Sequence, residues 1–248
     1  MQMTLGVAVD ISKSPDEVCP WGCGKKPHDD YKSKKQSENT KIESKPDQLG
    51  CSDVPGGGEG KWTTAKHHLI PAKQCFAKVR RLARMAMSVG YDINDKKNGI
   101  GLPTIKNPYT YEGKTKNYGK FTKNEKKEIA FDVMDKTNMQ WHVGHHRYKM
   151  GKYEECGPDD EPSLDQGVID HQTYDMEVID RLIKEMCQWD EAKICEEKDE
   201  DLSEEAKECM NRISKEIEDK LKAFQYGNSK PYFVSELARI WKPKHNRE

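Results

Sequence analysis

The chain lacks any long apolar run. Only 34% of its 248 residues are hydrophobic, and its mean hydropathy is −1.01. No stretch approaches the roughly 18 to 20 consecutive apolar residues that span a bilayer. The first residues also do not show a charged region followed by an apolar stretch, which is the pattern of a signal peptide. We therefore expect no membrane partner, and we expect any export to depend on a dedicated secretion machinery.

The chain has almost no net charge, at −1, but its charges are unevenly distributed. Residues 61–152 contain 20 Lys and Arg against seven Asp and Glu, whereas residues 153–221 contain eight against 24. A strongly basic segment is typical of proteins that bind the phosphate backbone of nucleic acids. The acidic segment could neutralise the basic one, form a solvated helical surface or bind another protein.

The eight cysteines do not by themselves predict disulfides in a chain of this length. Cys19 and Cys23, together with His28 and the more distant Cys51, are compatible with a structural zinc knuckle. The C-x-x-x-C spacing is loose for such a site. For a cytosolic protein, free thiols are the alternative interpretation.

Five of the eight histidines fall in two short segments, as His67, His68, His142, His145 and His146. His142 and His146 are four residues apart, so on a helix they share one face and can hold one divalent metal ion. Zn²⁺, Mg²⁺ and Mn²⁺ are the candidates. Neighbouring residues on a strand point to opposite faces, which favours one of His67 and His68 as a third ligand and the other as a general base. The spacing alone does not decide which is which.

Asn98 lies between the two histidine segments, in the run Asn98-Gly99-Ile100-Gly101. Its side-chain amide could orient the base or bridge a loop, and we expect the two glycines to permit a tight turn. An open metal site can polarise a phosphoryl oxygen and stabilise the leaving oxygen of a phosphodiester. This combination of residue types indicates a one-metal nuclease.

The same residues resemble a known family. The quoted motifs are Ala65-Lys66-His67-His68-Leu69-Ile70-Pro71, Asn98-Gly99-Ile100-Gly101-Leu102-Pro103, and His142-x-Gly144-x-His146 with Tyr148. They look like the AHH branch of the HNH/endonuclease VII superfamily of bacterial ββα-metal nucleases, over roughly residues 60–155. One departure is Lys66, which is inserted or substituted before the histidine pair of the family's Ala-His-His.

The resemblance implies a role for each residue of the site. His67 would be the first metal ligand and His68 the general base, with Asn98 supporting the base. His142 and His146 would complete the ligands of one divalent metal ion.

The resemblance further implies a metal-dependent endonuclease that hydrolyses DNA with little sequence specificity. Such domains act as antibacterial toxins, which type VI or similar machinery delivers into the cytoplasm of a target bacterial cell. A cognate immunity protein would protect the producer. Two alternatives stay open: an RNase or a phage or restriction-type nuclease with the same site, and a non-catalytic zinc-stabilised module that binds nucleic acid or protein.

Basic residues near the histidine segments are candidates for contact with the nucleic acid: Lys66, Arg80, Arg81, Arg84 and Arg147. Lysines alternate with tyrosines between residues 106 and 123. This pattern suits contact with a nucleic-acid backbone, and it suits an ordinary surface loop equally well.

For the fold we expect an α+β protein, mainly α, with a small ββα-metal core and a C-terminal helical extension. Residues 1–60 would be a polar, largely irregular segment with a Gly-rich linker, 61–155 the nuclease core, and 156–248 the acidic helical extension. We expect a short strand or an extended entry to the site at 62–70, a loop-rich stretch over 91–121, and helices after Pro71, around Ile129 and at His142. Further helices are expected at 173–195, 203–225 with Ser203 as N-cap, and 232–241.

Overall fold

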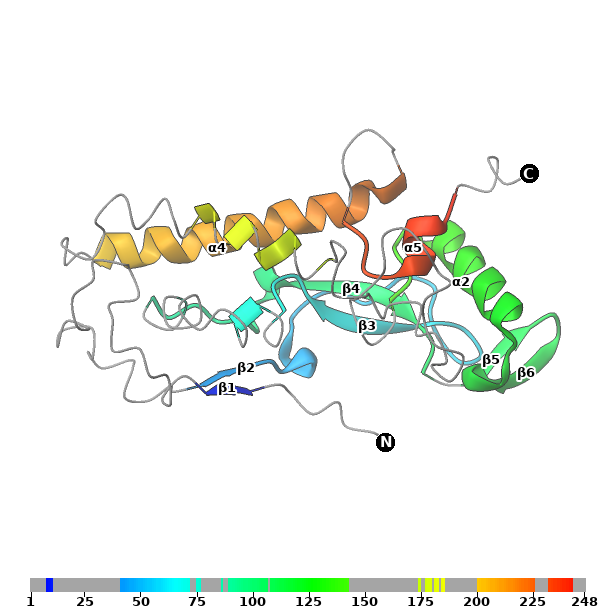
Figure 1. Cartoon of the computed structure of the whole chain (residues 1–248). Coiled ribbons are helices and arrows are strands. Elements are labelled where there is room, and N and C mark those ends of the chain that lie inside the picture. Colours follow the sequence, from blue (N-terminus) through cyan, green and yellow to red (C-terminus); the bar gives the residue numbers. More distant parts are fainter. Residues whose placement is uncertain are drawn as a thin grey trace. The chain divides into compact units, whose positions relative to one another are not determined.

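The computed structural model describes residues 8–10, 41–71, 75–76, 86, 89–106, 108–142, 174, 177–179, 181–182, 184–185, 200–225 and 232–242 (Figure 1). The protein is α+β, as expected from the sequence. Its strands are β1 (Ala8–Asp10), β2 (Lys41–Glu43), β3 (Thr63–His68), β4 (Gly99–Thr104), β5 (Pro108–Tyr111) and β6 (Lys114–Asn117). The α-helices of the described residues are α2 (Lys123–Thr137), α4 (Glu200–Lys222) and α5 (Glu236–Ile240). Among the described residues, none of the helices combines the length and the apolar content needed to cross a membrane.

The strands form two-stranded sheets that pair β1 with β2, β3 with β4, and β5 with β6. Of the two conformations expected for 62–70, a short strand or an extended entry, the structure shows the strand, β3. Within residues 1–60, the described part contains the antiparallel strands β1 and β2 and the buried side chains of Leu49 and Val54.

The prediction that residues 91–121 are mainly loop was wrong. Three strands occupy much of this range, and β5 and β6 form an antiparallel hairpin. Glu112 and Gly113 both have positive φ, at 50° and 74°, which is the type I′ geometry that suits a two-residue hairpin turn. β5 and β6 were not predicted because their sequences lack an alternating apolar pattern. Most of their positions are exposed and carry residues such as Lys, Thr and Asn, and Tyr109 is the buried residue of β5.

Gly99 and Gly101 were expected in a tight turn, but both lie in β4. Gly101 is required there for a different reason. A Cβ at this position would lie 2.2 Å from the carbonyl oxygen of Ser52, so any side chain would force the two backbone segments apart.

The helices predicted around Ile129, at 203–225 and at 232–241 are confirmed. Most residues of the helices predicted after Pro71 and at 173–195 lie outside the described residues. α2 begins with a capping box, in which Thr122 accepts from the Glu125 N–H and the Glu125 carboxylate accepts from the Thr122 N–H. α4 starts at Glu200, so Ser203 lies inside the helix rather than at its N-cap. The inward residues predicted for the helix at 203–225 are all buried: Ala206, Met210, Ile213, Ile217 and Leu221 on α4, and Phe224 in the 3-10 turn that follows it. α5 is shorter than predicted and is capped by Ser235.

The chain divides into two compact units that are discontinuous in sequence. The first takes its described residues from Met1–Gly50, His68–Gly99 and Asp175–Glu216, and the second from Cys51–His67, Ile100–Tyr174 and Ile217–Glu248. The units do not follow the predicted boundaries at residues 60 and 155, because those boundaries divide the chain into continuous segments. The functional division at these two residues stays a prediction. The division falls between His67 and His68, so each histidine belongs to a different unit.

The second unit has a well-defined apolar core. Figure 1 shows α2 and α5 packed side by side, with the β5–β6 hairpin at the N-terminal end of α2. The core contains Trp62, Tyr109, Phe121, Ile129, Val133, Met134, Trp141, Phe224, Leu237 and Trp241. Each large apolar side chain buried in this way contributes about 1.5 to 3 kcal/mol to folding. This core is the scaffold for the first part of the candidate site.

Candidate functional site

In the second unit, the structure brings together two of the three predicted metal ligands. His67 near the end of β3 and His142 after α2 have ring centres 5.4 Å apart, with an angle of 62° between the ring planes. Both side chains are buried, at 1% and 9% exposure. On β3, Ala65 and His67 are both buried, as alternate positions on the core-facing side of a strand should be.

His142 does not lie on a helix, contrary to the expectation from its spacing to His146. α2 ends at Thr137, because Asn138 adopts the left-handed conformation with φ 54°. The chain then runs beside β4, and the His142 N–H donates to the Pro103 carbonyl oxygen at 2.9 Å. This bond fixes the backbone of His142 relative to the β3–β4 pair.

Gln140 anchors the same segment, a role that no sequence motif indicated. Its buried amide donates to the carbonyl oxygens of Leu221 and Tyr232, at 2.8 and 2.7 Å, and its oxygen accepts from the Val234 N–H at 3.0 Å. Ser235 Oγ donates to the Trp141 carbonyl oxygen at 2.7 Å. The two residues before His142 are therefore tied to the C-terminal part of the chain, which limits the positions its ring can take.

The imidazole of His142 is held in its neutral form. Burial, together with the nearby positive charge of Lys106, lowers its pKa from 6.5 to about 4. A neutral imidazole is the form that binds a metal ion.

Tyr174 is a third residue at this pair, and no sequence motif pointed to it. Its hydroxyl lies 3.3 Å from Nε2 of His67, and the two ring centres are 5.3 Å apart. Tyr174 is fully buried and its ring packs edge-on against Tyr232, with 6.1 Å between centres. The Tyr174 hydroxyl therefore contacts Nε2, one of the two nitrogens through which His67 could bind a metal ion.

The third predicted ligand, His146, lies outside the described residues, as do His145 and Arg147. Within the part of the chain that the structure describes, no group of three or more His, Cys, Asp and Glu side chains could hold a metal ion. The complete three-histidine site thus stays a prediction, of which the His67–His142 pair is the described part.

The predicted base, His68, has its own partners in the first unit. Its Nε2 lies 3.1 Å from Oδ1 of Asn94, and its Nδ1 lies 3.4 Å from Oγ of Ser44. Burial lowers the pKa of His68, while the hydrogen bond with Asn94 and the charge of Asp92 act in the opposite direction. The net result is a histidine that is neutral at physiological pH.

These contacts assign the tautomer of the neutral ring. Oδ1 of Asn94 also accepts from the Lys45 N–H at 2.6 Å, which identifies this atom as the carbonyl oxygen of the amide. Since an oxygen acceptor faces Nε2, that nitrogen carries the hydrogen and Nδ1 carries the lone pair. Nδ1, beside the Ser44 hydroxyl, is consequently the basic atom of His68.

Asn98 bridges a loop, which is one of the two roles that its sequence position allowed. Its Oδ1 accepts from the Ile70 N–H at 2.8 Å and from Ser214 Oγ at 3.0 Å. Its Nδ2 donates to the carbonyl oxygens of Ile93 and Ile70. The amide has no described contact with His68, and Asn94 is the amide that orients this ring. The sequence Asp92-Ile93-Asn94 was a possible signal for Asn94, because an Asp two residues earlier is typical of a local turn. In the structure the Asn94 N–H donates to the Asp92 carboxylate in such a turn.

Most of the other predicted binding residues lie outside the described part of the chain: Arg80, Arg81, Arg84, Cys19, Cys23 and His28. Lys66 on β3 is half-buried. Cys51 is described as a free, half-buried thiol.

Comparison with known proteins adds no relative to this picture: no family model matches the chain, and neither a curated protein nor a solved structure matches it significantly.

Proposed function

We propose that the protein is a metal-dependent endonuclease that hydrolyses DNA phosphodiester bonds with little sequence specificity. The observation that carries the proposal is the 5.4 Å between the ring centres of His67 and His142. Two imidazoles that bind one ion at a tetrahedral angle, through metal–nitrogen bonds of about 2.1 Å, place their ring centres about 5 Å apart. The pair therefore has the spacing of two ligands of one ion.

In this proposal His67, His142 and His146 hold one divalent metal ion, Zn²⁺, Mg²⁺ or Mn²⁺, in the ββα-metal core of an AHH-type nuclease. The bound ion supplies Lewis-acid stabilisation of the charge that develops on the phosphodiester oxygens. The neutral His142 suits this role, because it loses no proton when it binds the metal.

His68, the next residue in the chain after His67, acts as the general base. Its Nδ1 takes a proton from water, the resulting hydroxide attacks phosphorus, and the bond to one ester oxygen breaks. Asn94 holds the opposite nitrogen of the ring and so keeps the lone pair on Nδ1. Asn98 supports the site indirectly, by fixing the chain at Ile70.

The cellular role follows from the family resemblance. The protein would be an antibacterial effector that a specialised secretion machinery delivers into a target cell, with an immunity protein in the producer. An RNase with the same residues is the nearest variant of this proposal.

One observation favours a second candidate function, a non-catalytic module stabilised by zinc. His67 and His142 are buried, at 1% and 9% exposure, and Tyr174 contacts His67. Structural zinc sites are closed in this way, whereas catalytic sites keep one position open for water or substrate. This candidate predicts metal binding with no turnover.

The test uses the full-length protein with supercoiled plasmid DNA and, separately, with structured RNA. Each substrate is incubated with Zn²⁺, Mg²⁺ or Mn²⁺, and with EDTA. Nicking of the plasmid that depends on metal supports the proposal, and cleavage of RNA alone would replace DNA as the substrate. Tight zinc binding with both substrates intact would contradict the proposal and favour the structural module.

A further inference from the structure

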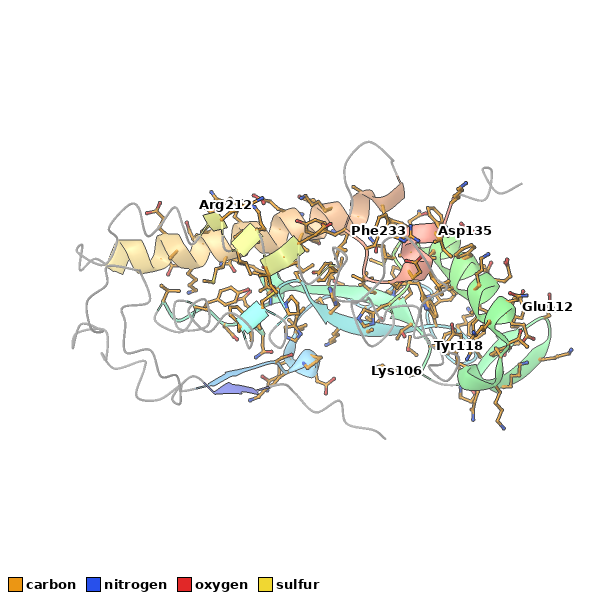
Figure 2. All side chains as sticks on the ribbon, in the orientation of Figure 1. Lys106, Glu112, Tyr118, Asp135, Arg212 and Phe233 are labelled. Carbon is orange, nitrogen blue, oxygen red and sulfur yellow. The ribbon has the colours of Figure 1, made fainter. Side chains whose placement is uncertain are left out.

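The β5–β6 hairpin and the start of α2 carry positive charge that the protein leaves largely uncompensated. Between Lys106 and Lys123 the chain has five lysines and a single acidic residue, Glu112. Four of these lysines are exposed, and together they define the hairpin lysine surface: Lys106, Lys114, Lys120 and Lys123. Figure 2 shows Glu112 at the outer turn of the hairpin and Tyr118 where the hairpin meets α2.

Neighbouring lysines have partners, but most members of this surface do not. Lys116 pairs with Glu125 at 3.3 Å and lies over the Phe121 ring at 4.3 Å. Among the described residues, the ammonium groups of Lys114, Lys120 and Lys123 have neither an ion pair nor a hydrogen bond. Lys123 is moreover the first residue of α2, where a positive charge is unfavourable because it meets the positive end of the helix dipole. Folding therefore gains little from these charges.

The scaffold beneath the lysines is well packed. Tyr109 is buried, and three tyrosine rings surround Phe121, with ring centres 6.2 to 6.5 Å from it: Tyr109, Tyr111 and Tyr118. The hydroxyls of Thr110 and Thr115 are 2.8 Å apart across the hairpin. The surface is thus held on a fixed frame, so a partner would not have to order it.

The surface also extends to the candidate metal site. Lys106 belongs to the same unit as His142 and follows Pro103 by three residues, and the Pro103 carbonyl oxygen accepts from the His142 N–H at 2.9 Å. A polyanion that reaches Lys106 would therefore lie close in sequence to the part of the chain that is bonded to His142.

We propose that the hairpin lysine surface binds the phosphate backbone of the DNA substrate and guides it to the metal site. The inference rests on the proposed nuclease function for the identity of the substrate. It assigns backbone binding to residues outside the three motifs that indicated the chemistry. Contacts of this kind carry no sequence information, which agrees with cleavage of low specificity.

The test measures DNA binding in EDTA, so that binding is separated from cleavage. A fluorescently labelled duplex is titrated with wild-type protein and with the triple variant Lys114→Gln, Lys120→Gln, Lys123→Gln over about 50 to 200 mM salt. Each lost phosphate contact reduces the slope of log affinity against log salt by about 0.9, so the triple variant should lose about 2 to 3. Its affinity at the lowest salt should fall tenfold or more.

A matched control removes the same charge elsewhere. Lys136, Lys207 and Lys222 are each paired with an acidic residue, so Lys136→Gln, Lys207→Gln, Lys222→Gln changes net charge equally without touching the surface. This variant should keep a slope close to that of the wild type. Thermal unfolding of both triple variants checks that the fold is intact.

Three outcomes would overturn the inference: equal loss of slope in the two triple variants, no DNA binding by the wild type, or surface-dependent binding of polyglutamate in preference to DNA. The last result would assign the surface to an acidic protein partner. DNA binding that requires the hairpin lysine surface, without cleavage under any metal, would support the inference and contradict the nuclease function. A failure of the inference can therefore be distinguished from a failure of the proposed function.

Discussion

The hydroxyl of Tyr174 lies 3.3 Å from Nε2 of His67, although 107 residues separate them in the chain. The contact places a hydrogen-bonding group on a nitrogen that could bind a metal ion. If the ion uses this nitrogen, it must displace the phenol.

We predict that Tyr174→Phe increases the affinity of the protein for Zn²⁺ about two- to tenfold, since one buried hydrogen bond contributes about 0.5 to 1.5 kcal/mol. Isothermal titration calorimetry measures the change. Tyr232→Phe is the control, because Tyr232 packs against Tyr174 and has no described contact with His67. Weaker binding in Tyr174→Phe would show instead that the hydroxyl orients the ring for binding through Nδ1.

The contact between Asn94 and His68 predicts a change in pH dependence. A carboxylate in place of the amide favours the charged imidazole, so Asn94→Asp should raise the pKa of His68. Burial lowers this pKa in the wild type, so cleavage should persist below pH 6.5 and fail only at lower pH. In Asn94→Asp, activity should be lost at a higher pH, as rate profiles of the two proteins would show. The exposed Asn117→Asp is the control, and coincident profiles of Asn94→Asp and wild type would exclude His68 as the base.

Asn98 should matter for stability more directly than for chemistry. Asn98→Ala removes the partners of the Ile70 N–H and the Ile93 carbonyl, which are then left unsatisfied in the interior. We expect a loss of about 2 to 4 kcal/mol in the free energy of unfolding, measured by urea denaturation. Asn117→Ala on the surface should cost less than about 0.5 kcal/mol. Equal stability of the two variants would contradict the bridging role.

The buried His142 predicts acid sensitivity of the metal-free protein. Its folded-state pKa of about 4 lies below the 6.5 of an unfolded chain, so below pH 6.5 the unfolded state binds a proton that the folded state does not. Its contribution is therefore complete above pH 6.5 and is lost progressively as pH falls to 4. The loss, measured in EDTA as the difference between wild type and His142→Gln, should reach about 3 kcal/mol. A difference that does not vary with pH would show that the folded protein protonates His142 normally.

The periodic spacing of apolar residues predicted the helices, because helix formation depends on residues that are close in the sequence. The apolar spacing of α4 and the residues around Ile129 predicted helices, and both are present with their inward residues buried. The β5–β6 hairpin was missed, because its turn is Glu112-Gly113 rather than the more diagnostic Asn-Gly or Asp-Gly. His142 was expected on a helix from its spacing to His146, but the left-handed Asn138 and the bond to β4 determine its conformation.

The candidate site was predictable only in part, because some of its contacts join residues that are far apart in the sequence. The family resemblance predicted His67 and His142 as ligands of one ion. The structure places their ring centres 5.4 Å apart, and their binding of a metal stays a prediction. Tyr174 and Gln140 depend on contacts across more than 80 residues, for which the chain carries no local signal. Asn94 and Asn98 are the same residue type four positions apart, and only the fold distinguishes the amide that orients His68 from the one that bridges the loop.

The most direct measurement of the central proposal is metal binding and plasmid cleavage on the same samples of wild type, His67→Ala and His68→Ala. The two variants should differ, because one removes a metal ligand and the other removes the general base. His67→Ala should lose both metal affinity and cleavage. His68→Ala should keep the wild-type metal affinity and lose at least about 100-fold in cleavage rate. Cleavage by His68→Ala at the wild-type rate, or unchanged metal affinity in His67→Ala, would contradict the proposed division of roles between the two neighbouring histidines.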